Sequence, residues 1–354
     1  MQDKKTGIDA YTFINKIFDK AHKDFNSIVL TESEIKELIY GSKIHFHSFS
    51  EKRKCSVKYC RKKAVNSHLF QESLLKKNSK NGHYIYPATD FEERKVKLAK
   101  IGVNKALTFP GFCETHEDMF EYEKNEKLIF EYELRTLVYK AICYNHVYWD
   151  IIYKYSENSI KALIEKKHEK FEKSKNDKYK KIFNLLNIDI KNFHFSDPRH
   201  QHFKSYLKES KKTINETLVF KKLAWKDIES DKDENLKSCI IEIDSVIPIF
   251  FSYFGDLTIK NEDLTFAEKA CLIIHPFKES TKLIFTTTNK NYKLLETILN
   301  RLSPESTLHF ILSALVYVSD NWLINEDFYD KYIPTSMKNL LESAISLPLI
   351  PNKK

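Results

Sequence analysis

Glycine and proline are scarce in this chain, at six and nine of 354 residues. No G-x-G-x-x-G or G-K-[ST] motif occurs, which argues against dinucleotide cofactors and P-loop nucleotide chemistry. No run of 18 uncharged apolar residues occurs, and the first residues lack the apolar stretch of a secretion signal. We therefore expect neither a signal peptide nor a membrane span, and no membrane partner.

Cysteine is also limited, with six residues, too few for a disulfide scaffold in a chain of this length. Cys143, Cys239 and Cys271 lie in apolar surroundings and are predicted to be buried thiols. This usage favours a reducing compartment, so we expect a cytoplasmic protein.

Apolar residues make up 42% of the chain and aromatic residues 13%, which excludes a disordered protein, and a length of 354 residues allows two or three domains. The formal net charge of +9 is compatible with a nucleic-acid partner without requiring one. The charge is concentrated, because residues 51–63 carry seven Lys or Arg residues against one Glu.

Hydrophobic periodicity predicts helices over 9–25, over 114–171 and over 177–187, and Thr31 with Glu34 resembles a capping box. Residues 43–50 alternate as a strand or loop would, and residues 51–112 are polar and irregular. β-Branched and aromatic runs at 215–225, 238–254 and 270–287 predict an antiparallel sheet, followed by helices near 291–302 and 304–318.

These patterns predict an α+β fold in four regions. They are an N-terminal helical segment (1–50), a region (51–125) in which Cys55, Cys60, Cys113 and His116 resemble the ligands of a zinc-binding treble clef, a helical region (126–190) and an α+β domain with an antiparallel sheet and helices (191–354).

Two short-spaced pairs carry the chemistry: Cys55 with Cys60, and Cys113 with His116. Pro110 and Gly111 break the chain just before the second pair, which places both of its members on the first turn of a helix, on one face. Thiolates and imidazoles at such spacings are typical of a tetrahedral zinc site. We predict one structural Zn²⁺ held by these four residues; an alternative substitutes His68 for one of them.

Ser67 and His68 follow the first pair, and this order of residues resembles the HNH, or ββα-metal, nucleases over residues 55–120. The resemblance implies that His68 is a general base for phosphodiester hydrolysis. It further implies that Asp118 or Glu117, with His83 as another member, holds a divalent ion such as Mg²⁺. The chain departs from the pattern at Ser67, where an acidic residue is usual, and offers no clear Asn midway.

A basic cluster beside the first pair predicts a surface that faces the phosphates of DNA or RNA. Its members are Lys52, Arg53, Lys54, Lys58, Arg61, Lys62 and Lys63. The rival interpretation is a non-enzymatic interaction module, in which zinc is scaffolding and the C-terminal domain binds another protein.

Overall fold

The computed structural model describes residues 53–90, 95–125, 131–174, 198–261, 263–317 and 321–343, with a few positions between 19 and 34. The chain divides into two compact units: residues 1–46, 153–209 and 350–354 form the first, and 47–152 and 210–349 the second. The segments 43–50 and 177–187, and most of the predicted helix over 9–25, lie outside the described residues.

In the first unit, Thr31 and Glu34 form the predicted capping box. The Thr31 backbone N–H donates to Glu34 Oε2 at 2.7 Å, and the Glu34 N–H donates to Thr31 Oγ1 at 3.3 Å. Lys170 Nζ also donates to Glu34 Oε2, at 2.6 Å. These bonds satisfy backbone donors that the start of a helix would otherwise leave unpaired.

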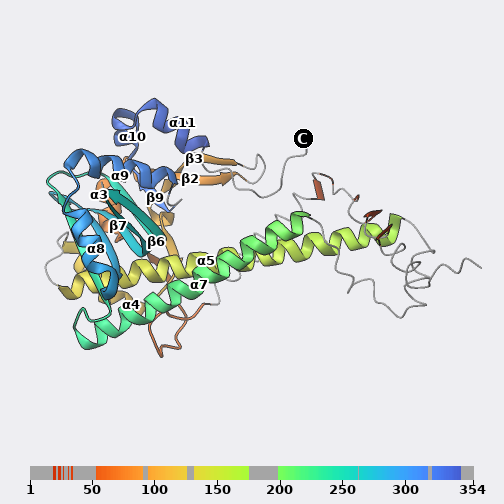
Figure 1. Ribbon diagram of the computed structural model, residues 1–354, viewed down its shortest axis with the longest axis horizontal. Coiled ribbons are helices and arrows are strands. Elements are labelled where there is room, and N and C mark those ends of the chain that lie inside the picture. The colour runs from red at the N-terminus through yellow and green to blue at the C-terminus, as the bar shows by residue number, and fades with distance from the viewer. Residues whose placement is uncertain are drawn as a thin grey trace, which may run out of the picture. The chain divides into compact units, whose positions relative to one another are not determined.

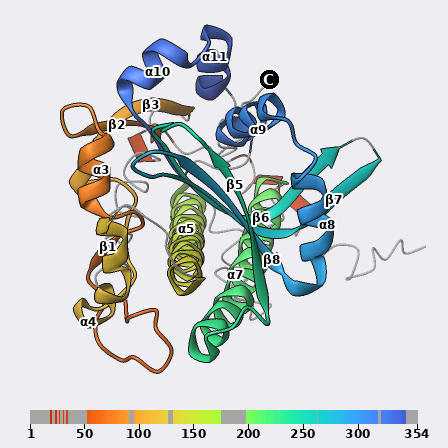
Figure 2. The ribbon, with the colours of Figure 1, turned by 90° about the vertical axis from the view of Figure 1, so that its left-hand side faces the viewer.

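The described part of the second unit contains a seven-stranded sheet in which every neighbouring pair is antiparallel (Figure 2). In spatial order its strands are β3 (Lys95–Gly102), β2 (His83–Asp90), β9 (Trp322–Ile324), β6 (Ile249–Asn261), β7 (Leu264–Pro276), β8 (Thr281–Thr288) and β5 (Leu236–Ile243). The predicted antiparallel sheet is confirmed over 238–254 and 270–287. The β2–β3 hairpin extends this sheet, so a segment from the first third of the chain shares it with the C-terminal region.

A separate two-stranded pair, β1 (Asn66–His68) with β4 (Thr108–Pro110), lies beside the sheet. The helices and 3₁₀ segments are α3 (Glu72–Asn78), η1 (Val103–Lys105), α4 (Glu114–Glu117), η2 (Asp118–Asn125), α5 (Glu131–Ser174), α7 (Pro198–Ser230), α8 (Asn289–Leu299), α9 (Pro304–Tyr317), α10 (Glu326–Tyr332) and α11 (Thr335–Ser343). None of the helices in the described part of the chain combines the length and apolar character needed to cross a membrane.

The two faces of the sheet bury different sets of side chains because residues alternate along each strand. In β6, Phe250 and Phe254 pack with residues of α5 and α7, whereas Phe251 and Leu257 pack with residues of α8 and α9. The second unit is therefore layered, with the sheet between these two groups of helices (Figure 1).

One predicted strand is wrong: residues 215–225 lie within α7. Phe220, Ala224 and Ile228 recur at every fourth position and are buried together in the core with α5. This helical spacing prevails over the short β-branched runs that suggested a strand.

Two further corrections concern the region around the candidate metal ligands. Residues 51–112 are not irregular, because they contain α3, β2, β3 and β4 and bury large side chains such as Phe70 and Tyr84. The predicted helix over 114–171 is divided into α4, η2 and α5. Most of its buried apolar residues join the core that contains residues of α5, whereas Ile85 belongs to the core on the other face of the sheet.

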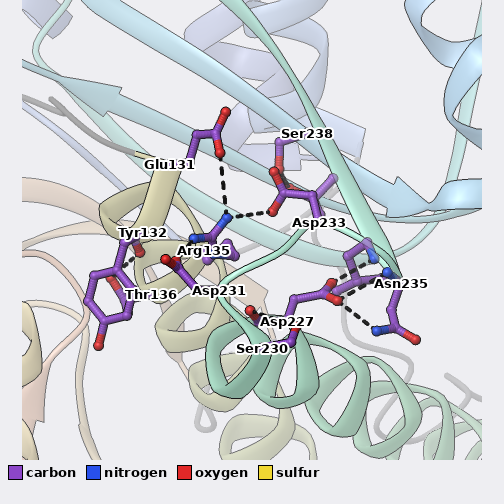
Figure 3. Close-up of polar contacts among 12 residues, drawn as sticks. Glu131, Tyr132, Arg135, Thr136, Asp227, Ser230, Asp231, Asp233, Asn235 and Ser238 are labelled. Carbon is purple, nitrogen blue, oxygen red and sulfur yellow. Dashed lines mark hydrogen bonds and ion pairs between the residues drawn. The ribbon is translucent and has the colours of Figure 1, made fainter.

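Arg135 joins the start of α5 to the turn after α7 (Figure 3). Its side chain is 8% exposed, and its guanidinium pairs with the carboxylates of Asp231 and Asp233, the latter at 3.1 Å. Near the end of α7 the buried Asp227 carboxylate accepts the backbone N–H of Asn235 at 3.0 Å. These charge-assisted bonds fix the start of β5 against α7.

His275, at the end of β7, is buried among aromatic rings. Its ring stacks on Phe277 with centroids 4.2 Å apart and meets the edge of Phe70 at 5.1 Å. Nδ1 lies 3.1 Å from the Pro276 carbonyl oxygen, to which Nδ1–H donates. Burial lowers the pKa of His275 to about 3, and the Lys140 ammonium acts in the same direction.

We expect this histidine to make the fold less stable in mild acid. Between about pH 6.5 and pH 3 the unfolded chain takes up a proton that the folded chain excludes, so stability falls as pH falls. From pH 7 to pH 5 the loss is about 2 kcal/mol. In urea unfolding at both pH values, His275→Asn, which keeps the donor but does not titrate, should remove this part of the pH dependence. His309→Asn, at an exposed site, should not; equal slopes for the two variants would contradict the assignment.

Candidate metal centre

The first ligand pair lies on a tight turn, residues 53–64, which we call the knuckle. An antiparallel bridge between Lys54 and Lys63 closes it, with the Cys55 N–H donating to the Lys62 carbonyl at 2.9 Å. Inside the turn the Cys60 N–H donates to the carbonyl of Val57 at 3.1 Å. This backbone pattern directs the sulfur atoms of Cys55 and Cys60 toward the same point, as the cluster distances below show.

The second pair lies at the start of α4. Cys113 occupies the N-cap position without a side-chain cap bond, and the His116 N–H donates to the Cys113 carbonyl at 2.8 Å. Glu114 and Thr115 are the first two residues of the helix itself. The Ser56 N–H donates to the Gly111 carbonyl at 2.8 Å and so joins the knuckle to the segment that leads into α4.

The four predicted ligands meet. Their ligand atoms lie within 4.8 Å of one another, and they form the one group of three or more metal-binding side chains found among the described residues. Nδ1 of His116 lies 3.3 Å from Cys55 Sγ and 3.4 Å from Cys113 Sγ, and the sulfurs of Cys60 and Cys113 are 3.9 Å apart. The cluster could therefore hold a metal ion. His68 is not a member.

The spacing matches a tetrahedral coordination sphere. Bonds of about 2.3 Å to sulfur and about 2.05 Å to nitrogen imply about 3.8 Å between two sulfurs and about 3.6 Å between sulfur and nitrogen. The three separations given above differ from these values by a few tenths of an ångström, and all the ligand atoms lie within 4.8 Å of one another. The donor set and its geometry thus fit one tetrahedral metal ion.

The pKa values of Cys55 and Cys113 are shifted in opposite directions. Burial raises the pKa of Cys55 to about 12. For Cys113, burial also opposes ionisation, but the His116 N–H and the neighbouring thiols outweigh it, and the pKa is lowered. Because thiolates are the ligands, a cation that enters this cluster displaces the remaining protons.

The basic residues predicted to face phosphate differ in their exposure and in their contacts. Arg53 is partly buried and pairs with Asp150 of α5, and Lys58 lies 3.7 Å from Glu229 of α7. Lys62 Nζ donates to Thr115 Oγ1 at 3.1 Å. The side chains of Lys54, Lys58, Arg61, Lys62 and Lys63 are exposed, whereas Lys52 lies outside the described residues.

The residues of the nuclease resemblance are held by other contacts. Nε2 of His68 lies 3.0 Å from the Val103 carbonyl oxygen, and Nδ1 of His83 lies 2.8 Å from the carbonyl oxygen of Asn81. Glu117 ends α4 and Asp118 begins η2. Within the part of the chain that the structure describes, these four residues do not form a group of three or more metal ligands.

Two features of this site were not predicted from the sequence. Tyr139 of α5 donates its hydroxyl to the Ser56 carbonyl at 2.8 Å and thereby anchors the knuckle to the core. Tyr59, at the knuckle tip, is 86% exposed and has a φ of 65°. An aromatic residue between Lys58 and a predicted metal ligand was the available signal for Tyr59. The Tyr139 contact depends on tertiary structure and leaves no local pattern.

Comparisons with known protein families, with curated protein sequences and with solved structures find no match to this chain.

Proposed function

We propose that this protein binds nucleic acid through the knuckle, and that a structural Zn²⁺ in the Cys₃His cluster holds the knuckle in shape. The observation that carries the proposal is the combination of a closed ligand set with an exposed basic and aromatic surface on the same turn. We call that surface the knuckle surface. It consists of Lys54, Lys58, Tyr59, Arg61, Lys62 and Lys63.

Zinc is the metal that this donor set favours. Soft thiolates with one imidazole in a tetrahedral arrangement suit Zn²⁺, whereas Mg²⁺ and Ca²⁺ require oxygen ligands. Four protein ligands leave no open position for water or substrate, which is typical of structural rather than catalytic sites. The metal would join the knuckle to α4, two segments that are about fifty residues apart in sequence.

The positive charge of the knuckle surface exceeds the negative charge of the metal cluster beside it. Three thiolates, one neutral imidazole and Zn²⁺ carry a net charge of −1, and Glu229 is the acidic partner found for Lys58. Five exposed cations against these two negative charges leave a surplus of positive charge. Lysine and arginine clusters of this kind bind phosphate backbones by releasing counterions.

The wider nuclease hypothesis, with His68 as general base and Mg²⁺ on Asp118 or Glu117 with His83, stays a prediction. We base the proposal on binding because the contacts of His68 and His83 go to backbone carbonyls. A denaturing gel of labelled oligonucleotide after incubation with Mg²⁺ would test it. Cleavage that His68→Ala abolishes without loss of zinc would establish the hydrolytic function.

Binding is expected to depend steeply on salt. With about four phosphate contacts to a single strand, affinity should fall about 50-fold between 50 and 200 mM salt. Fluorescence anisotropy with labelled single-stranded RNA, single-stranded DNA and duplex DNA measures this. The triple variant Lys54→Gln, Arg61→Gln, Lys63→Gln should weaken binding by at least about tenfold at 50 mM salt and reduce the salt slope.

A matched control removes the same charge from the other side of the sheet. Lys278, Lys290 and Lys293 are exposed, and two of them lie in α8, which packs on the opposite face from α5. Their replacement by Gln should leave affinity within about twofold if binding is local to the knuckle. Equal losses in both triple variants would indicate non-specific attraction to net charge. No binding to any of the three polymers at 50 mM salt would refute the proposal and favour the protein-interaction alternative.

A further inference from the structure

Tyr59 is the most exposed large hydrophobic side chain among the described residues, at 86%. It lies at the tip of the knuckle, directly before the ligand Cys60, in the segment that Figure 2 shows in orange beside α4. The Lys58 ammonium lies 4.8 Å from the ring centroid. The side chain therefore adds little to the packing of the fold.

The backbone conformation of Tyr59 is unfavourable for a tyrosine, and no packing of its side chain compensates for it. Its φ of 65° lies in the left-handed region, where glycine and asparagine are usual and a bulky residue is not. Leu107 also has a positive φ, of 48°, but its side chain packs against the core. At Tyr59 the strain is not offset by burial, and such strain is concentrated at functional sites.

The turn that carries Tyr59 is formed by other residues. Cys55 and Cys60, two of the candidate metal ligands, lie on either side of it, and the Cys60 N–H to Val57 carbonyl bond closes it around Tyr59. The same turn carries the exposed cations of the knuckle surface, so the exposed ring and these cations share one surface.

We infer that Tyr59 stacks on an unpaired base, so that the ligand of the knuckle surface is a single-stranded nucleic acid. This inference rests on the proposed function and names its substrate class. In a duplex the base faces are covered by their neighbours, whereas single strands offer them to aromatic side chains. The flanking lysines and arginine contact the backbone on either side of the stacked base.

Tyr59→Gly and Tyr59→Phe separate stacking from folding. Glycine relieves the positive φ and removes the ring, so its melting temperature should not fall below that of the wild type. Its affinity for a single-stranded oligonucleotide should fall about five- to 150-fold, the range that loss of one base–aromatic stack gives. Tyr59→Phe keeps the ring face and should bind within about threefold of the wild type.

A single 2-aminopurine in the oligonucleotide reports the stack directly, because its fluorescence is quenched when it stacks on a ring. Quenching is expected when the wild type or Tyr59→Phe binds the oligonucleotide. It should be absent even when the oligonucleotide is saturated with Tyr59→Gly. RNA and DNA versions of the same strand show whether the sugar matters. Affinity for a duplex of the same sequence should be unchanged within about twofold by either substitution.

The outcomes distinguish this inference from the proposed function. If the wild type binds single strands with salt dependence and Tyr59→Gly binds equally well, the stacking inference fails and the proposed function stands. If Tyr59→Gly weakens duplex and single-strand binding to the same extent, Tyr59 acts as a general contact and the inference is also overturned. If the wild type binds neither polymer, the proposed function fails and takes the inference with it.

Discussion

Replacing Cys113 with alanine is expected to abolish metal binding and to destabilise the protein by about 4 kcal/mol. Cys113 is 3% exposed and belongs to the four-ligand cluster. A metal that binds only the folded state stabilises it by about 4 kcal/mol when its concentration is a thousand times the Kd. Because structural zinc binding contributes folding free energy, removing one ligand removes most of this stabilisation.

The measurement combines elemental analysis with denaturant unfolding. Purified reduced wild type should contain about one equivalent of zinc per chain, and Cys113→Ala less than about a tenth. Cys271→Ala is the matched control, since Cys271 is a buried free thiol of β7 that lies outside the cluster. It should keep the metal and lose only the small packing contribution of one sulfur atom.

Chelation tests the same point without mutation. A strong zinc chelator should lower the unfolding midpoint of the wild type and of Cys271→Ala, and should have little effect on Cys113→Ala. Cobalt(II) in place of zinc should give the visible absorption of tetrahedral thiolate coordination. A metal-free wild type whose thiols are fully reduced, or chelation without effect on its stability, would contradict a structural metal site.

The four metal ligands could be predicted because the residues of each pair are close in sequence. Each pair lies on one turn, so the spacings of Cys55 with Cys60 and of Cys113 with His116 already fix which atoms can share a metal. That the two turns meet depends on tertiary structure, and the structure confirms it. By contrast, the contact of His68 with the Val103 carbonyl joins residues 35 apart in sequence, and no local pattern indicates it.

The sheet was predictable only in part. Its central strands β6, β7 and β8 carry apolar side chains on both faces and are recognisable as short hydrophobic runs. The hairpin of β2 and β3 was missed because it contains Pro87 and many charged residues and lies at one end of the sheet. β3 is an edge strand and tolerates charged residues, and β2 pairs with β9 at Ile85 and not at Pro87, so the composition of the hairpin resembles that of a loop.

Breaking the buried ion pair between Lys140 and Glu123 is expected to cost about 3–5 kcal/mol. Lys140 is fully buried in α5, Glu123 is 3% exposed in η2, and Nζ lies 2.8 Å from Oε1. Oε2 accepts the Gln71 backbone N–H at 3.0 Å, and Nζ lies 4.6 Å from the centroid of the Phe120 ring. Lys140→Met therefore leaves a carboxylate buried without its counter-charge.

The expected destabilisation comes from the Glu123 carboxylate that Lys140→Met leaves unpaired. It does not measure the net contribution of the intact ion pair to stability. Burial raises the pKa of Glu123, and the Lys140 ammonium opposes that rise; without the ammonium the carboxyl should take up a proton at higher pH. In Lys140→Met the lost stability should then be partly recovered as pH falls toward 5, because protonation removes the unpaired charge. The wild type should gain less from this carboxyl over the same range, because the ammonium limits the rise in its pKa.

The double variant Glu123→Gln with Lys140→Met removes both charges and keeps an amide oxygen for the Gln71 N–H. Its stability should return to within about 1–2 kcal/mol of the wild type, which gives a coupling energy of several kcal/mol in the double-mutant cycle. Such recovery would mean that the pair positions η2 against α5 rather than stabilising the fold outright.

Since η2 continues directly from α4, zinc content is the second measurement. Lys140→Met should keep about one equivalent, because the ligand pairs are held by their own turns. A single-variant loss below about 1 kcal/mol would contradict the burial of an intact ion pair.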